Sequence, residues 1–346
     1  MASEADRIRG EIDKISRSTG LGSLSDAYGQ MLAGINHRGL GNPINSNQDN
    51  SGIILFTRPD LNLSYDNLSA RRTLMNYASN NIEHTLQRYC RVALDPRGSR
   101  MYNIETPLFR SNNWFIPLLT NNLLSMSGWP DRVIETFTST PGVRKEVVSM
   151  VNGMFNHYGE ISLTANFRNI VGNPVPSLLS LWLEYCEAVF LGEMLPYPHS
   201  MIDQRMDYTT RIYVLILDPS RRFVQSFATT LGFPTVDPTG ARFNHTGDEV
   251  MMQSSSQISI NFLCNGLIVN DPLEIHNFNR RAQKFDPGME IVGVGNTGTI
   301  KLKGQKYQLR GDEIKRGNYQ GIPIIHPYTQ ELMWFVSKEE YDELYT

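Results

Sequence analysis

A set of strand patterns between residues 207 and 264 constrains the fold most strongly. The segment YTTRIYVLILD is followed, after the turn DPS at residues 218–220, by RRFVQSFATT, and both have the length and apolar content of strands. Farther along, SSSQISINFLCNG places four apolar residues on one face by alternation: Ile258, Ile260, Phe262 and Cys264. Because two strands joined by a tight turn pair as a hairpin, this region predicts an antiparallel sheet.

The preceding segment predicts a further strand and a helix. In VVSMVNGMFNHYGEISLTAN, the residues from Ile161 to Ala165 alternate apolar and polar, as in a half-buried strand. Ser177 follows Pro174 and is expected to cap a helix that ends near Gly192. The apolar face of this helix is expected to carry Leu178, Leu181, Trp182, Tyr185 and Val189.

The first 140 residues contain both helix and strand patterns. Apolar spacing predicts two helices within the first forty residues, a polar loop at 39–52 and a short strand at 53–56. Residues 67–93 have a helical pattern. Within 103–140, NIETPLFRSNNWFIPLLTNN is interpreted as a strand or strand pair, whereas the class of DRVIETFTST stays open.

Residues 293–298 read GVGNTG, which is the glycine spacing of a dinucleotide-binding turn. In that motif the third glycine opens a helix, whose N-terminus holds the pyrophosphate. Here the following TIKLKGQKYQL alternates Ile300 and Leu302 with lysines, as a strand does. We therefore expect a β-hairpin and no nucleotide cofactor.

The predicted fold class is α+β, with three parts. Residues 1–52 are expected to form N-terminal helices and a polar arm, and residues 53–285 an α+β domain with its core at 145–280. Residues 286–346 contain the GVGNTG hairpin and two strand patterns, GIPII and LMWFVS, before an acidic terminal turn. This run of short strand patterns predicts a small, separate β module.

The sequence offers little that would support catalysis. The seven histidines and three cysteines show no metal-binding spacing, and no nucleophile elbow or phosphate loop is present. The best local candidate is FNHTGDE, where His245, Asp248 and Glu249 crowd a glycine-containing loop, although polar residues gather at loop tips in any case. We expect no catalytic residue, metal or cofactor.

Charge and hydropathy narrow the range of partners. The net charge of −3 and pI near 6.2 give the whole chain no attraction to nucleic acid, while arginine pairs such as Arg280-Arg281 could grip phosphate locally. The longest apolar stretch, Ile212 to Leu217, is far shorter than a bilayer span, so no membrane role is expected. Cys90, Cys186 and Cys264 are widely spaced and indicate a reducing compartment.

The order of elements from 145 to 280 resembles the tail-tube fold of contractile-tailed bacteriophages. The resemblance rests on the helix SLLSLWLEYCEAV, the YPHS turn, the long strand DYTTRIYVLILD, the phrase FATTLGFPTVDPTGARFN and the closing strand SQISINFLCNG. It is closest in kind to larger virion proteins of big myophages, which carry this fold with extra domains. It implies an antiparallel sandwich whose strands join a ring-shaped barrel, with a helix packed outside.

The resemblance also implies where subunits meet. Strands at 207–218, 222–230 and 255–264 would face the neighbouring subunits and the lumen, and Phe233-Pro234 with the following loop would reach the adjacent ring. The implied subunit interface contains Tyr208, Arg211, Tyr213, Arg222, Phe223, Phe233, Phe243, Ile258 and Ile260.

Together these observations predict a non-enzymatic structural protein of the virion tail, made in the host cytoplasm. The N-terminal region and C-terminal module favour one specialised ring, a tail-tube initiator or baseplate-proximal tube protein. Expected partners are copies of the chain and other tail or baseplate proteins, with DNA at most in the lumen. The alternatives are a neck, tail-terminator or head-side structural protein, and a phage hydrolase with a C-terminal binding module.

Overall fold

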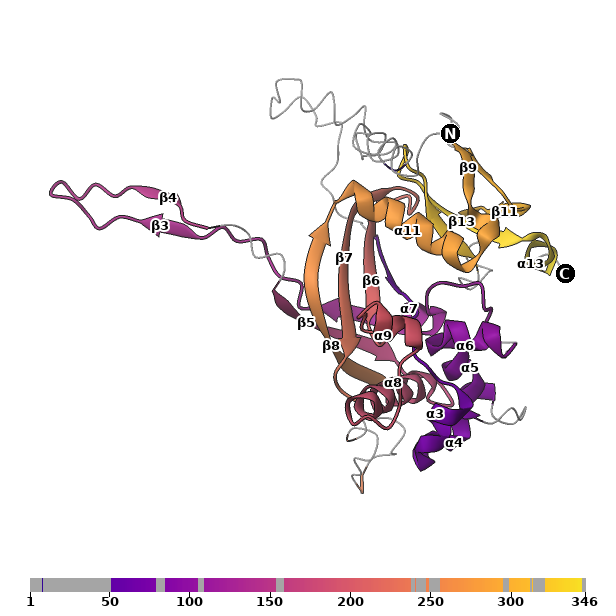
Figure 1. Cartoon of the computed structure of the whole chain (residues 1–346). Helices are drawn as coiled ribbons and strands as arrows, with labels where there is room; N and C mark the ends of the chain where they lie inside the picture. The colour runs from indigo at the N-terminus through magenta and orange to yellow at the C-terminus, as the bar shows by residue number, and fades with distance from the viewer. Residues whose placement is uncertain are drawn as a thin grey trace.

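A curled six-stranded sheet organises the chain in the computed structural model, with helices and smaller sheets around it (Figure 1). The predicted N-terminal helices lie outside the described residues. The described residues are 8, 51–78, 85–104, 109–153, 159–237, 240, 247–248, 256–294, 299–311, 313 and 321–343.

The main sheet is antiparallel throughout and nearly closes into a barrel. At one edge Thr57 forms a bridge with Phe115, and the chain then passes through α7 (Pro117–Asn122) into the strand at the opposite edge. The expected α+β class with a barrel-like antiparallel domain is confirmed. In sheet order the strands are β1 (Ser51–Phe56), β6 (Thr210–Leu217), β7 (Val224–Pro234), β8 (Gln257–Val269), β5 (Glu160–Arg168) and β2 (Leu123–Ser127).

The strand patterns predicted this sheet well. The expected β6–β7 hairpin is confirmed, and β5 pairs with β8 so that Leu163 lies opposite Phe262 and Ala165 opposite Ile260. These side chains share one face and are fully buried. One difference concerns Phe233 and Pro234, which end β7 instead of opening the loop that follows.

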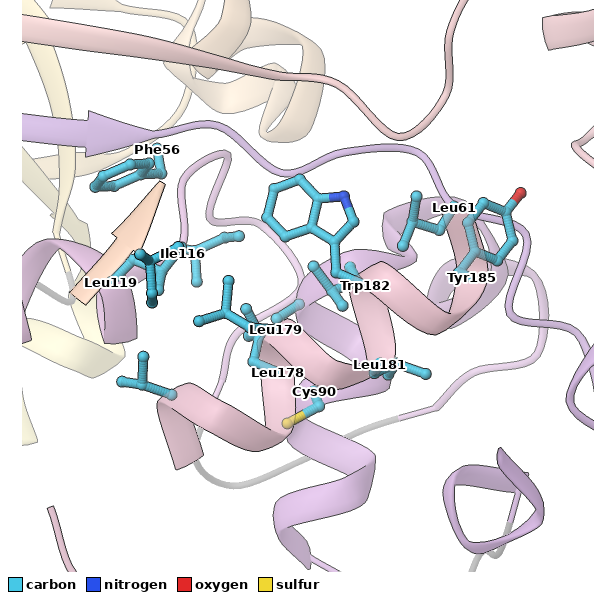
Figure 2. Close-up of a cluster of buried hydrophobic side chains, with 14 of the residues drawn as sticks. Phe56, Leu61, Cys90, Ile116, Leu119, Leu178, Leu179, Leu181, Trp182 and Tyr185 are labelled. Carbon is cyan, nitrogen blue, oxygen red and sulfur yellow. The ribbon is translucent and has the colours of Figure 1, made fainter. Parts of the chain in front are cut away.

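Helix α8 (Pro174–Phe190) covers this buried face, and Figure 2 shows its side chains packed between the sheet and α5 (Thr85–Leu94). The predicted cap is wrong. The N-cap lies four residues earlier, at Asn173 in a left-handed conformation, because Pro174 fits the first turn of the helix. Ser177 lies inside the first turn, where its hydroxyl donates to the Asn173 carbonyl. The predicted apolar face is otherwise confirmed, with Leu178, Leu181, Trp182 and Tyr185 fully buried.

Short helices flank the sheet on the side of α8. The helical prediction for 67–93 is confirmed in its described parts, although the helices are short and interrupted. They are α3 (Tyr65–Ala70), a 3-10 turn (Arg72–Leu74), α4 (Met75–Ala78), α5 and, directly after Asp95, α6 (Pro96–Met101). A further short helix, α9 (Pro198–Ile202), precedes β6.

The strand prediction for 103–122 is wrong for the described residues, which contain single bridges at Phe109 and Phe115 but no strand. Pro117 occupies the first turn of α7, a position that suits proline's fixed φ and missing N–H. The apolar pair Phe115 and Ile116 is buried by tertiary packing and not by a regular strand. After β2 the chain forms a two-stranded hairpin, β3 (Thr136–Thr138) with β4 (Ser149–Val151).

Helix α11 (Pro272–Phe285) was not predicted, because only Ile275, Phe278 and Ala282 mark its apolar stripe. It lies on the other face of the sheet, where Phe278 meets the rings of Trp114 at 4.9 Å and Tyr213 at 5.2 Å. This second core also receives the C-terminal strands.

The C-terminal strands form small sheets. The strands of the predicted hairpin are confirmed as the antiparallel pair β9 (Ile291–Val294) and β10 (Ile300–Leu302), while residues 295–298 of GVGNTG lie outside the described residues. A second sheet has the order β11 (Lys306–Leu309), β13 (Leu332–Ser337), β12 (Ile322–Ile325). The predicted acidic terminal turn is a helix, α13 (Lys338–Glu343), which lies with these sheets at the yellow end of the chain (Figure 1).

Candidate assembly surfaces

The β3–β4 hairpin extends far from the rest of the molecule (Figure 1). We call residues 128–152 the arm. Nearly every residue of the arm is exposed, and the pair Phe137 and Met150 faces solvent at 49% and 55% exposure. The arm also exposes Val133, Ile134, Val143, Val147, Val148 and Val151.

Such an arm is unusual for an isolated monomer. A two-stranded hairpin is at best marginally stable alone in water. Apolar side chains gathered on a protruding surface usually mark an interaction site. The arm is therefore a candidate contact to another protein surface.

Strand β2 provides a second candidate surface at the base of the arm. Among the described residues it pairs with β5 alone, so its other edge offers backbone groups to a further strand. Strand β1 is the opposite edge of the same sheet, and its end is covered by the bridge between Thr57 and Phe115.

The solvent face of β2, β5 and β8 is polar and uncharged over its middle. Thr164 donates to Asn261 at 3.0 Å, and Asn166 donates to Ser125 at 2.9 Å, so these side chains hold one another in place. Glu160 at one end of β5 and Arg168 at the other carry the charges on that strand. This face is built from Ser125, Ser127, Ser162, Thr164, Asn166, Ser259 and Asn261.

The structure divides the predicted interface residues into two groups. Tyr208 and Phe233 are partly exposed, and their rings meet edge to face at 5.2 Å. Arg222 is exposed and pairs with Glu331 at 2.6 Å, beside the partly exposed Phe223. These four residues remain accessible on the surface of the chain.

The second group is engaged inside the chain. Tyr213, Ile258 and Ile260 lie in the two cores, and Arg211 is partly buried against Glu274 at 2.6 Å. Their side chains contact this chain's own interior. Phe243 lies outside the described residues.

Two buried carboxyl groups sit beside tyrosines where the helices meet the sheet. Asp95 accepts hydrogen bonds from the Leu63 and Gly98 amides and from the Tyr197 hydroxyl. Burial raises the pKa of Asp95 to about 6, against the opposing effect of these hydrogen bonds. Asp207 accepts from the Tyr185 hydroxyl, and burial raises its pKa as well.

These groups hold segments together and line no described catalytic cluster. Among the described residues, no group of histidine, cysteine and carboxylate side chains could hold a metal ion. The three thiols are unpaired, and burial raises the pKa of Cys90 to about 12 and that of Cys264 to about 11, which makes them unreactive. None of the described helices is long and apolar enough to cross a membrane.

The candidate catalytic loop lies largely outside the described residues. Asp248 is described and exposed, whereas His245 and Glu249 lie outside the described residues. His199 lies outside this loop, where its ring nitrogen is 3.2 Å from the Asp60 carboxylate.

The arm is the surface that sequence reasoning missed. Its strands are only three residues long in the structure, and DRVIETFTST alone did not distinguish strand from helix. A signal was present in TPGVRKE, residues 140–146, because a Pro-Gly pair between β-branched runs is typical of a turn between strands.

Comparison with known proteins gives one match that spans the chain. A family model described as "Putative phage tail tube protein" matches residues 2–346. No curated protein sequence matches the chain. Among solved structures, the tube-terminating cap of the anti-feeding prophage is 12% identical with a TM-score of 0.27, covering 46% of this chain and 83% of that one. A chain from the sheath-tube complex of an extracellular contractile injection system is 13% identical with a TM-score of 0.25, over the same shares.

Proposed function

Because the chain belongs to the phage tail tube protein family, we propose that it forms a closed ring with copies of itself in a contractile tail. Tail tube proteins are structural components of the virion and not enzymes, so the hydrolase alternative is set aside. Assembly in the host cytoplasm, before the particle is complete, is part of the proposal.

The exposed apolar arm carries the proposal. An arm with both strands in water loses the burial that would hold it in one conformation, and a neighbouring copy supplies that burial. A ring of identical copies gives each arm an identical receiving surface, which is the head-to-tail arrangement that closes by rotation.

The open edge of β2 and the exposed part of the predicted interface fit the same arrangement. Tyr208, Arg222, Phe223 and Phe233 are available for contacts between neighbours, while the buried residues contribute through their strands' backbone and the fold. The uncharged polar face of β2, β5 and β8 is then the surface that lines the channel, since the other faces are covered by helices or by the C-terminal strands.

We place this ring at the beginning of the tube, as an initiator next to the baseplate. The support is the extra chain on the tube-like domain, residues 1–52 and 286–346, which a subunit repeated along the whole tube does not need. A tail-terminator or neck position is the competing outcome, and other tail proteins are the expected neighbours in either place.

The self-association test uses the full chain and the double variant Phe137→Asp/Met150→Asp. We expect the unmodified chain to form closed oligomers in mass photometry and the variant to remain monomeric with unchanged thermal unfolding. The matched control is Val171→Asp/Val292→Asp, which adds the same charge at exposed apolar sites away from the arm. Oligomers of equal mass in both double variants would contradict a role for the arm.

A further inference from the structure

A basic patch lies where α6 meets the end of α11, and nothing in the proposed ring uses it. Arg97 and Arg100 are three residues apart on α6, and Arg281 and Lys284 have the same spacing on α11. Residues at this spacing share a helix face, so each helix presents two cations on one side. Four of the cations thus come from segments about 180 positions apart in the sequence.

Direct contacts hold the two helices together at this point. Arg100 donates from its guanidinium to the Phe285 carbonyl at 2.8 Å and lies over the Phe285 ring at 5.3 Å. Arg281 donates to the Tyr213 hydroxyl at 3.2 Å. Because each arginine uses one donor within the chain, its guanidinium is oriented while further N–H groups remain for a ligand.

A third segment adds another cation. Arg97 pairs with Asp60 at 3.0 Å, and Asp60 also contacts His199 in α9 at 3.2 Å. The backbone N–H of Arg205 donates to the carbonyl of Ser200, the residue after His199, and the Arg205 side chain is 76% exposed. Arg205 is close enough to α11 for its charge to act on the Lys284 ammonium.

The described ion pairs of these five cations involve two carboxylates. Asp60 is shared between Arg97 and His199, and Asp203 lies 3.6 Å from Arg205. Partial loss of water around the Lys284 ammonium lowers its pKa, and although Asp60 opposes this, Arg281, Arg97 and Arg205 lower it further. The like charges therefore repel one another across the patch, which an anionic ligand would relieve.

We propose that this basic patch, formed by Arg97, Arg100, Arg205, Arg281 and Lys284, binds the phosphate backbone of double-stranded DNA without sequence preference. DNA carries a negative charge every ~1.7 Å along its axis, so several cations can be neutralised at once. Four of the five are arginines, whose planar fork suits phosphate oxygens. The chain's net charge of −3 confines the attraction to the patch.

The experiment measures binding of a fluorescent 20-base-pair duplex to the unassembled full chain by anisotropy, at several salt concentrations. The test variant is Arg205→Glu/Lys284→Glu, two exposed side chains with no strong internal partner. The matched control is Arg168→Glu/Lys301→Glu, which makes the same change in net charge at exposed sites on β5 and β10. Thermal unfolding of each variant checks that the fold is kept.

We expect the test variant to weaken DNA binding by 10-fold or more and the control by less than about 2-fold. The slope of log K against log salt should fall by about 2 for the two lost phosphate contacts. Equal losses in both variants, no binding by the unmodified chain, or equal displacement of DNA by polyglutamate at matched charge would overturn the inference. The last result would assign the patch to an acidic protein. Ring formation is scored separately, so a chain that forms rings without binding DNA refutes only this inference.

Discussion

At the scale of single residues, buried polar groups fix the junction between the helices and the sheet. Arg58 is almost fully buried, yet it donates to the carbonyls of Val92, Ala93, Ser111 and Asn113. Burial lowers the pKa of Arg58 to about 9, aided by the nearby Arg100, so it stays charged at neutral pH. It joins the end of α5 to the segment before α7.

We predict that Arg58→Met destabilises the chain by roughly 3–5 kcal/mol, because four buried carbonyls lose their donor together. Urea unfolding followed by circular dichroism measures this. Arg58→Lys keeps the charge but loses the planar guanidinium, so its free energy of unfolding should lie between those of the unmodified chain and Arg58→Met. A loss below about 1 kcal/mol for the methionine variant would mean that the junction does not depend on Arg58.

Asp95 gives stability an uncommon dependence on pH. Burial raises the pKa of the Asp95 carboxyl from its ordinary 3.8 to about 6, so the folded state binds the proton more tightly than the unfolded state does. The tighter proton binding adds roughly 3 kcal/mol to the free energy of unfolding. This contribution is complete below about pH 3.8 and is lost as pH rises through about 6.

The comparison with Asp95→Asn isolates this group. The unfolding free energy of the unmodified chain, minus that of the variant, should be larger at pH 4.5 than at pH 7.5. Since other carboxyl groups titrate in both proteins, their effects cancel in the difference. A difference that is the same at both pH values would contradict the raised pKa of Asp95.

At the scale of elements, the sequence predicted the alternating strands of the main sheet. It did not predict the helices whose pattern depends on tertiary packing. The alternation in β5 and β8 identified both strands and their buried faces, because one face of each strand packs on helices. Helix α11 was not predicted because most of its residues are polar and its apolar stripe is narrow. Residues 117–122 were misassigned, since apolar content alone does not separate a short buried helix from a strand.

The candidate surfaces were predictable only in part. The resemblance indicated that subunits meet, but it was projected onto whole strands, so it included Ile258 and Ile260, whose side chains fill the core. Sequence periodicity does not reveal which of two sheet faces a second layer will cover. The arm depends on how far a hairpin projects from the sheet, which no local pattern records.

The contact between α11 and β12 tests the proposed boundary at residue 286. Asn279 donates to the Ile325 carbonyl at 2.8 Å and accepts from the Ile325 amide at 2.9 Å, in a buried position. We predict that Asn279→Ala, which leaves both backbone groups unpaired, costs about 2–4 kcal/mol in the C-terminal strands.

Amide hydrogen exchange measures the loss of stability caused by Asn279→Ala separately in each strand. If residues 286–346 form their own folding unit, the variant should accelerate exchange in β12 and β13 and leave β5 and β8 nearly unchanged. Uniform acceleration across all these strands would show one cooperative unit and would remove the proposed boundary.

At the scale of the whole molecule, two cores lie on opposite faces of one curled sheet, and the arm lies outside both. The six-stranded sheet is packed against a core on each face, while the arm has no core of its own and leaves the facing pair Phe137 and Met150 in solvent. A hairpin without a core of its own needs a second surface to cover its apolar side chains, and a neighbouring copy in a ring supplies that surface, which is the physical basis of the proposed function.

Cryo-electron microscopy of purified tails shows directly whether copies of this chain form a closed ring through their arms. We predict one closed ring of this chain at the baseplate end of the tube, with the arm of each copy packed on a neighbouring copy and Phe137 and Met150 buried there. Copies that do not touch one another, or arms that remain in solvent within the assembled tail, would contradict it.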